Sequence, residues 1–222
     1  MIPPSVDNDD RRQFVLDNTR LLNPPLVPEI VLHLAEESLP LWEKTEEQLG
    51  KMNVPPPYWA FAWAGGQALA RYTLDHPDVV RNAHVIDLGA GSGLCAIAAS
   101  LAGAADVLAA DVDPFSEHAM ALNATVNSVN LRITVDDLLS EPPLECDVLL
   151  IGDLFYEKDL ADRVMVWART IAQTGGDVLV GDPNRSFFPV DSFEKVAEYS
   201  VPVTRALEDS EIKRTSVWRL PV

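Results

Sequence analysis

Segment 84–94 constrains the fold more than any other part of the chain, because a short apolar run ends in an acid and is followed by three glycines at alternating positions. Residues 85–88 are typical of a strand buried on both faces, as in a parallel sheet. The glycines let the backbone turn sharply and approach a ligand that any Cβ would block. They are Gly89, Gly91 and Gly93. We therefore expect a strand, a tight loop and a helix over about 94–102 whose N-terminus faces the ligand.

Loops of this kind bind either dinucleotides or S-adenosylmethionine, and the spacing separates the two. A dinucleotide site has the pattern G-x-G-x-x-G, in which the last glycine allows close helix packing. Here Leu94 stands at that place, and the third glycine, Gly93, comes one residue early. The acid before the loop, Asp87, would repel a pyrophosphate but suits the cationic amine of a methionyl group. The loop therefore favours S-adenosylmethionine.

A second acid supports the same cofactor. Asp111 follows the apolar run 107–110 and lies 18 residues after Gly93, where a carboxylate can accept both ribose hydroxyls. The result is D-x-G-x-G-x-G with a distal acid, a pattern that resembles the seven-strand, Rossmann-like S-adenosylmethionine methyltransferases. The resemblance implies S-adenosyl-L-methionine as cofactor, with Asp87, the three glycines and Asp111 among the residues that bind it.

The rest of the chain alternates strands and helices, as a doubly wound sheet requires. The expected strands are 107–111, 131–135, 148–151 and 178–180, and the expected helices are 67–74, 115–127, 160–172 and about 191–198. Two final strands, near 201–206 and 213–220, form a hairpin that supplies an antiparallel edge. We therefore predict an α/β fold: a Rossmann-like seven-strand methyltransferase sheet with helices on both faces and an antiparallel last strand.

Extra helices are predicted before this core. The first starts at Asp7 or Asn8 and stops near residue 22, before a pair of prolines. A second follows over 28–37, and 41–49 extends it as a short acidic helix. With 222 residues, 47% of them hydrophobic, the chain suffices for one domain, 1–222. We divide it into an N-terminal helical extension, 1–54, and a catalytic core, 55–222.

A run rich in aromatic residues and glycines, 55–72, precedes the first strand of the core. An aromatic ring beside a sulfonium contributes about 0.5–2 kcal/mol of cation–π energy, and adjacent glycines let the backbone approach the methionine moiety. We assign Trp63 to cofactor contact. Tyr58, Trp59 and Phe61 either share this role or fill the core below the helix.

Acids also follow the third and fourth parallel strands. Asp136 or Asp137 is placed to meet the adenine amine or else to cap a turn, and we choose Asp137 for the cofactor site. Asp153 follows the fourth strand. Ligands of open α/β sheets lie beyond the carboxyl ends of the strands, so we expect Asp153 near the methyl group that is transferred.

The segment Asp153-Leu154-Phe155-Tyr156 is a D-x-x-Y motif, which resembles that of the seven-strand protein-lysine methyltransferases. With Pro56-Pro57-Tyr58-Trp59-Ala60 and Trp63-Ala64-Gly65-Gly66-Gln67-Ala68-Leu69, the chain is similar to the electron transfer flavoprotein β-subunit lysine methyltransferase branch over about 28–220. The glycine loop is generic to all these enzymes, and the other two stretches are more specific. The ribosomal protein L11 methyltransferases are the near alternative, although we expect no counterpart of their large N-terminal domain.

The resemblance implies methyl transfer to a lysine of a protein substrate, and it points to the electron transfer flavoprotein β subunit as that substrate. A free lysine has a pKa near 10.4, so its neutral form costs about 4–5 kcal/mol at pH 7. Because a carboxylate favours the ammonium, we assign Asp153 to capture and alignment of the lysine and not to strong general-base work. Tyr156 packs against the lysine stem, orients its nitrogen or anchors the loop. The alternative methyl acceptors are another protein, such as L11, or a small molecule. A third hypothesis is a protein that binds the cofactor without catalysis, but such a protein would not need a carboxylate at position 153.

Composition limits the partners and the compartment. A net charge of −17 argues against a nonspecific nucleic-acid binder, which needs clustered Lys and Arg; it permits a basic protein partner or simply favours solubility. Cys95 and Cys146 lie in apolar settings without metal-ligand spacing, so we expect reduced thiols and no metal. The chain shows no signal pattern, transit segment or membrane-length apolar run, so we expect no membrane partner and a cytoplasmic enzyme of bacterial type.

Overall fold

The computed structural model of the protein describes residues 8–36, 56–203 and 211–221. Its main sheet has seven strands in the order β5-β4-β3-β6-β7-β9-β8. They are β3 (His84–Leu88), β4 (Asp106–Ala110), β5 (Arg132–Thr134), β6 (Val148–Gly152), β7 (Asp177–Asp182), β8 (Glu194–Pro202) and β9 (Ile212–Arg219). The helices assigned in these residues are α1 (Asn8–Asn18), α3 (Ala64–Asp75), α4 (Leu94–Leu101), α5 (Pro114–Val126) and α6 (Lys158–Gln173).

The strand directions confirm the predicted seven-strand sheet. Strands β3 to β7 are parallel to one another. The last strand, β9, runs antiparallel to both β7 and β8 and lies between them, so β8 forms the edge. The carboxyl ends of five parallel strands therefore meet at one edge of the sheet, where such folds bind their ligands.

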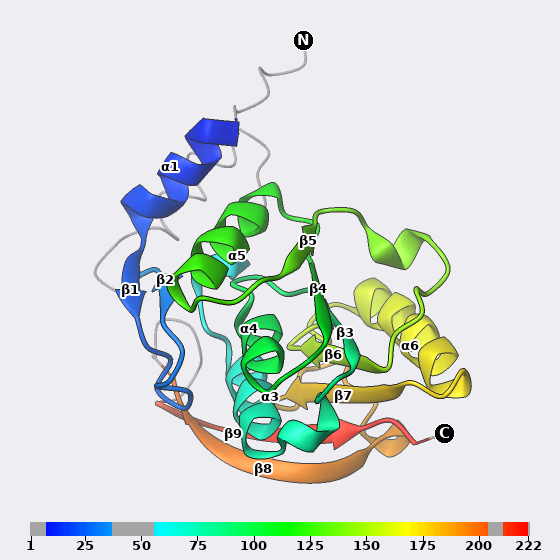
Figure 1. Cartoon of the computed structure of the whole chain (residues 1–222). Coiled ribbons are helices and arrows are strands. Elements are labelled where there is room, and N and C mark those ends of the chain that lie inside the picture. Colours follow the sequence, from blue (N-terminus) through cyan, green and yellow to red (C-terminus); the bar gives the residue numbers. More distant parts are fainter. Residues whose placement is uncertain (1–7, 37–55, 204–210, 222) are drawn as a thin grey trace.

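Helices cover both faces of the sheet, as predicted. Alternate residues of the parallel strands belong to two different hydrophobic clusters: Val85 and Leu150 pack with α3 and α4, whereas Ile86 and Leu149 pack with α6. In Figure 1, α3 and α4 lie on one side of the central strands and α6 on the other. Burial on both faces explains why the central strands are mostly apolar.

The second N-terminal helix, predicted over 28–37, is wrong. The chain instead forms β2 (Leu32–Leu34), which pairs antiparallel with β1 (Arg20–Leu22) in a separate two-stranded sheet. The first helix, α1, is confirmed but ends before β1. The acidic helix over 41–49 and the boundary between 54 and 55 lie outside the described residues and stay predictions.

Tertiary contacts explain the strand at this place. Ile30, Leu32 and Leu34 are buried in the same hydrophobic cluster as α3 and α4. The backbone N–H of His33 donates a 2.7 Å hydrogen bond to Asn123 Oδ1 on α5. A short apolar run fits a helix and a strand about equally well, so partners distant in sequence decide its conformation.

The helix predicted over about 191–198 is also wrong. A short 3-10 turn, Val190–Ser192, is followed directly by β8. This strand pairs with β9 along its length, with an irregularity between Lys195 and Ala197. The predicted hairpin is confirmed, but its first strand begins at Glu194 and its connecting turn lies outside the described residues.

Helix α3 begins at Ala64, earlier than the predicted start at Gln67. Two glycines therefore lie in its first turn, where glycine lowers helix stability. A Cβ on Gly65 would overlap the carbonyl oxygen of Gly181 and lie 2.5 Å from Asp153 Oδ2. The first turn of α3 thus packs directly on the carboxyl ends of β6 and β7.

Candidate active site

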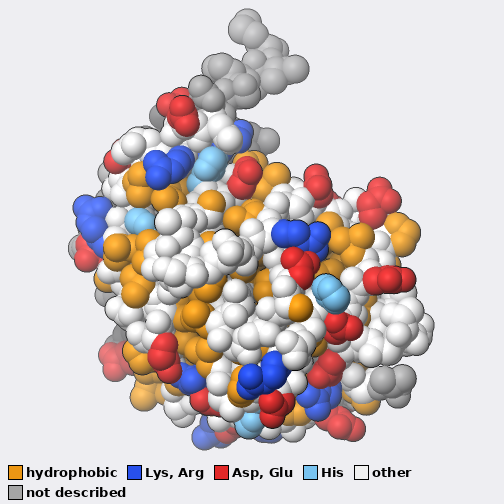
Figure 2. Space-filling model, viewed as in Figure 1, with side chains coloured by type: hydrophobic (Ala, Val, Ile, Leu, Met, Phe, Trp, Pro, Cys, Tyr) orange, Lys and Arg blue, Asp and Glu red, His pale blue; other side chains and the backbone are white. Residues whose placement is uncertain are grey.

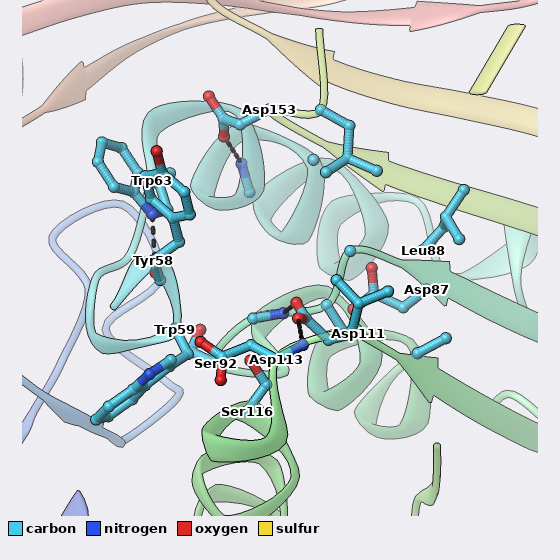
Figure 3. Close-up of a pocket in the computed structure, with 18 of the residues that line it drawn as sticks. Tyr58, Trp59, Trp63, Asp87, Leu88, Ser92, Asp111, Asp113, Ser116 and Asp153 are labelled. Carbon is cyan, nitrogen blue, oxygen red and sulfur yellow. Dashed lines mark hydrogen bonds between the residues drawn. The ribbon is translucent and has the colours of Figure 1, made fainter. Parts of the chain in front are cut away.

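A cavity of about 660 Å³ lies at the carboxyl edge of the sheet. The segments that follow β3, β4, β5, β6 and β7 line it, together with residues that precede and begin α3. The predicted site residues found in its wall are Trp63, Asp87, Gly89, Gly91, Asp111, Asp137, Asp153 and Tyr156. Figure 3 shows Asp111 and Asp153 on opposite sides of this space. The topology therefore brings together residues from distant parts of the sequence.

Gly93 is the predicted site residue that is not in the cavity wall. It is the N-cap of α4 and has a left-handed backbone with φ of 81°. A Cβ here would lie 3.2 Å from Met120 Cγ on α5. The structure thus gives Gly93 a role in turning the loop and packing two helices, and a direct cofactor contact stays a prediction.

Gly89 and Gly91 have positive φ values of 70° and 51°. Side chains other than that of glycine rarely adopt this backbone. At Gly89 a Cβ would also approach the Leu154 side chain to 2.5 Å, whereas at Gly91 its nearest neighbour would be Trp59 Cα at 3.6 Å. Backbone conformation therefore requires both glycines, and the loop they form lines the cavity.

Asp87 lies at the base of the glycine loop and is 2% exposed. Its Oδ2 accepts a 2.8 Å hydrogen bond from the Ala96 N–H in the first turn of α4. Burial, with the nearby charge of Asp111, raises the pKa of Asp87 to about 7. A cation bound beside it would favour the ionised form, as expected for a carboxylate that faces an amine.

Asp111 joins two loops of the site. Its Oδ2 accepts a 2.8 Å hydrogen bond from the Gly91 N–H, and its Oδ1 accepts one of 2.9 Å from the Asp113 N–H. Burial raises the pKa of Asp111, against the effect of these bonds. Each carboxylate oxygen can accept more than one bond, so the fixed carboxylate retains capacity for ligand hydroxyls.

Two residues near Asp111 were missed by sequence reasoning. Asp113 caps α5 by accepting a 2.9 Å bond from the Phe115 N–H, and burial raises the pKa of Asp113 to about 6. Ser116 is 1% exposed and lines the cavity. Its Oγ makes no hydrogen bond of good geometry within the described residues, although it is near enough to help lower the pKa of Asp111. A ligand hydroxyl would satisfy this oxygen.

Asp136 and Asp137 both line the cavity after β5. The Asp137 Oδ2 lies 2.6 Å from Nη2 of Arg163 on α6. Its Oδ1 accepts a 3.2 Å bond from the Leu139 N–H and so caps a short 3-10 turn. The turn-capping alternative therefore holds for Asp137, and its contact with adenine stays a prediction.

Asp153 lies on the opposite side of the cavity with a left-handed backbone, φ 56°. It is 8% exposed, and its Oδ2 accepts a 2.8 Å hydrogen bond from the Gly66 N–H of α3, drawn dashed in Figure 3. A non-glycine residue in this conformation costs of order 1–3 kcal/mol, and such strain clusters at functional sites. The fold therefore forces the carboxylate of Asp153 toward α3 and the cavity.

Arg185 is the main site residue that sequence reasoning missed. Its Nη2 and Nε donate to Asp153 Oδ1 at 2.7 Å and 3.2 Å. The guanidinium carbon also lies 5.7 Å from the centroid of the Trp63 ring. Arg185 follows β7, so the strand-end rule that selected Asp153 would have selected it too.

Aromatic rings form the wall beside this ion pair. The Trp63 Nε1–H donates a 2.9 Å bond to the Tyr58 carbonyl, and the Tyr58 ring centroid is 5.6 Å from that of Tyr156. Tyr58 and Tyr156 are 41% and 43% exposed, whereas Trp59 and Phe61 are buried in a cluster. Trp59 and Phe61 thus fill the core and also line the cavity, and Tyr58 belongs to the cavity mouth.

The donor set fits S-adenosylmethionine. The volume of about 660 Å³ is in the range of small-ligand cavities. Asp111 and the buried Ser116 hydroxyl suit a ribose diol, and Asp87 suits an amine. Within residues 8–36, 56–203 and 211–221, no group of three or more His, Cys, Asp or Glu could hold a metal ion, and no helix is long and apolar enough to cross a membrane.

The chain resembles known proteins over nearly its whole length. It is 38% identical over 218 residues to the electron transfer flavoprotein beta subunit lysine methyltransferase of Danio rerio, covering 95% of this chain and 83% of that protein. The human protein of the same name is 38% identical over 214 residues, covering 93% of this chain and 80% of that protein.

Two further matches concern parts of the chain. The family model described as ribosomal protein L11 methyltransferase (PrmA) matches residues 67–152. A solved structure of magnesium protoporphyrin IX methyltransferase from Synechocystis, with bound S-adenosylmethionine, has a TM-score of 0.51 at 11% identity and covers 71% of this chain and 78% of that chain. This second likeness shows the fold alone.

Proposed function

The chain belongs to the electron transfer flavoprotein beta subunit lysine methyltransferase family, and from this premise we propose that it methylates lysine side chains of that flavoprotein subunit. It is an S-adenosylmethionine-dependent methyltransferase. The observation that carries the choice of acceptor is Asp153, a buried, strained carboxylate that faces the cavity beside Trp63 and Tyr156. Such a carboxylate and aromatic wall would align the long, amine-bearing side chain of a lysine.

The residues divide between the two ends of the cavity. Asp111 and the loop of Gly89 and Gly91 hold the ribose, and Asp87 lies on the side of the methionyl amine. S-adenosylmethionine, when bound, supplies an electrophilic methyl group on a positively charged sulfur. At the other end, Asp153 aligns the incoming lysine and Tyr156 packs against its stem. Burial raises the pKa of Tyr156 to about 12, so its hydroxyl stays neutral and serves as a hydrogen-bonding group.

The L11 methyltransferase match supports the cofactor half of this assignment and not the acceptor half. It ends at Gly152, one residue before Asp153. Tyr156 and Arg185, which complete the acceptor end, also lie beyond it. Ribosomal protein L11 and small molecules therefore remain outcomes to be tested rather than proposals.

Charge and thiol chemistry bear on the partner and the compartment. The net charge of −17 favours a partner with an exposed basic segment and disfavours nucleic acid. Figure 2 shows acidic side chains spread over the viewed face among lysines and arginines, so any attraction acts over a broad surface. Cys95 and Cys146 are free thiols, which suits a reducing compartment such as the cytoplasm.

The decisive experiment is methyl transfer from labelled S-adenosylmethionine to purified electron transfer flavoprotein. Ribosomal protein L11 and a small-molecule fraction of the cell extract are offered in parallel. Mass spectrometry then locates the label. We expect it on a lysine of the flavoprotein β subunit, and label on L11 or on a small molecule alone would overturn the proposal.

A further inference from the structure

The acceptor end of the cavity contains a cation that the proposed function leaves unexplained. Arg185 approaches Asp153 Oδ1 through two donors at 2.7 Å and 3.2 Å and lies over the Trp63 ring. The side chains of Arg185 and Asp153 are 21% and 10% exposed. An ion pair this sheltered is screened little by solvent, so it changes the electrostatics of whatever binds beside it.

The position of Arg185 is built into the fold. Its backbone N–H donates a 2.7 Å hydrogen bond to Oδ1 of Asp182, which is 1% exposed at the end of β7. The preceding residue, Asn184, has a left-handed backbone with φ of 72°. A further bond of 3.1 Å, from the Phe187 N–H to the Phe155 carbonyl, ties this loop to the loop of Asp153. The two loops thus hold the charges together.

Lysine methylation needs such an arrangement because its two requirements conflict. The lysine must be aligned, for which a carboxylate is suitable, and it must lose its proton before it can attack. An opposite charge within about 4–6 Å shifts a pKa by 1–3 units toward the charged form. An uncompensated Asp153 would therefore retain the lysine as an ammonium, whereas a guanidinium on the same carboxylate cancels this effect.

Resting on the proposed function, we propose that Arg185 is a positioning residue that offsets the charge of Asp153, so that the carboxylate aligns the substrate lysine without trapping its ammonium form. The lysine loses one proton to water. Its nitrogen lone pair then forms the N–C bond to the methyl group as the C–S bond breaks, and the electron pair of that bond stays on the sulfur of S-adenosylhomocysteine. The product ammonium releases its additional proton to water.

Other titratable groups near this pair, among the described residues, are few. Burial raises the pKa of Asp182 to about 7, with the charge of Asp153 contributing, so Asp182 titrates in the working range. Burial raises the pKa of Cys95 and that of Tyr156, which keeps both neutral. Asp87 and Asp111 face the cofactor half of the cavity. Among these described groups, Asp182 is therefore the one whose titration a pH experiment must control.

The test is the pH dependence of kcat/KM for methyl transfer to the flavoprotein in the parent, Arg185→Gln, Asp153→Asn and the double variant. In the profile of kcat/KM against pH, we expect the rising limb of Arg185→Gln to lie about one pH unit above that of the parent, so that transfer at pH 7 is about tenfold slower. The rising limb of Asp153→Asn should lie at lower pH than that of the parent. In the double variant both charges are absent, so its limb should return close to the parental position.

A second measurement does not depend on turnover. Calorimetry in two buffers counts the protons released when the flavoprotein binds the enzyme loaded with S-adenosylhomocysteine. The parent should release more protons than Arg185→Gln, because its bound lysine is less protonated. Repeating the comparison in an Asp182→Asn background removes the titration of Asp182. Arg185→Lys keeps the positive charge, so its rising limb in the pH profile should match that of the parent, and this variant provides a test even if Arg185→Gln does not fold.

The outcomes separate the two proposals. A uniform loss of rate with unchanged limbs and unchanged proton release in Arg185→Gln would show a merely structural role and overturn the inference. The inference would also be overturned if the rising limb of Arg185→Lys shifted to higher pH as far as that of Arg185→Gln. Failure of the parent to methylate the flavoprotein, while it binds S-adenosylmethionine, would instead refute the proposed function.

Discussion

Two adjacent glycines at the start of α3 provide a matched pair of substitutions. A Cβ on Gly65 would overlap the Gly181 carbonyl oxygen and lie 2.5 Å from Asp153 Oδ2, whereas a Cβ on Gly66 would have nothing within 4 Å. Both residues are helical, and alanine keeps the Gly66 N–H that donates to Asp153. Gly65→Ala and Gly66→Ala are therefore matched for a comparison of stability, although Gly66 alone of the two lines the cavity.

The magnitude follows from two opposing effects. Replacing glycine by alanine in a helix gains about 0.5–1 kcal/mol, and this gain is common to both variants. Overpacking a rigid site costs about 1–3 kcal/mol, and the backbone oxygen of Gly181 cannot move away by changing a rotamer. We expect Gly66→Ala to be as stable as the parent or slightly more stable, and Gly65→Ala to be less stable than Gly66→Ala by about 1–3 kcal/mol.

Denaturant unfolding measures the difference in free energy of unfolding, and thermal unfolding should separate the two by about 2–4 °C per kcal/mol for a chain of this size. Because the added methyl group of Gly65→Ala displaces the Asp153 carboxylate, its methyl transfer should fall about 10²-fold. Its affinity for S-adenosylmethionine should change much less, since Asp111 lies on the opposite side of the cavity. Equal stability of the two variants, with parental transfer rates, would refute the packing argument.

Three further substitutions or conditions test the site. Asp111→Asn should weaken S-adenosylmethionine binding by about 1.5–3 kcal/mol, measured by calorimetry, because the charged acceptor for hydroxyls is lost; unchanged affinity would contradict its role. The folded-state pKa of Asp87, about 7, exceeds its unfolded value, so below pH 7 the folded free protein holds a proton that the bound amine should expel. Affinity should therefore rise from pH 6 to about pH 7 with proton release. Equal binding enthalpies at pH 6.5 in two buffers of different ionisation enthalpy would contradict this. Tyr156→Phe should slow single-turnover transfer less than Asp153→Asn does; a larger loss would give the tyrosine hydroxyl a direct part in the reaction.

The centre of the fold is predictable because its strands are buried on both faces. Val85 packs in one hydrophobic cluster and Ile86 and Leu88 in the other, so these three positions must be apolar, and the glycines after them adopt left-handed backbone. Local sequence and tertiary structure impose the same requirement here. The same agreement located Asp111, since it directly follows the next buried strand, β4.

The two wrong helix predictions concern segments where local sequence and tertiary structure do not impose the same requirement. Around Ile30 and Leu34 the spacing of apolar residues fits both the helical and the strand period. The hydrogen bond from the His33 N–H to Asn123 on α5 favours the strand. Along β8 the side chains of Lys195 and Glu198 form an exposed ion pair at 2.9 Å, an i,i+3 pair that would suit a helix equally well. Its partner strand, β9, lies later in the chain, and local sequence does not report that pairing.

The acceptor end shows the same division within the site. The rule that ligands lie beyond the carboxyl ends of parallel strands places Asp153 after β6, and it applies equally to Arg185 after β7. What the rule does not contain is that the two loops meet, because their contact depends on the parallel pairing of Gly152 with Gly181 and on Asp182 holding the Arg185 backbone. The D-x-x-Y motif alone gives a negative charge that attracts an ammonium, whereas the structure adds the Arg185 guanidinium on the same carboxylate. In the proposed role of Arg185, the electrostatics that the substrate lysine meets therefore depend on a contact between two strand-end loops, which no single motif reports.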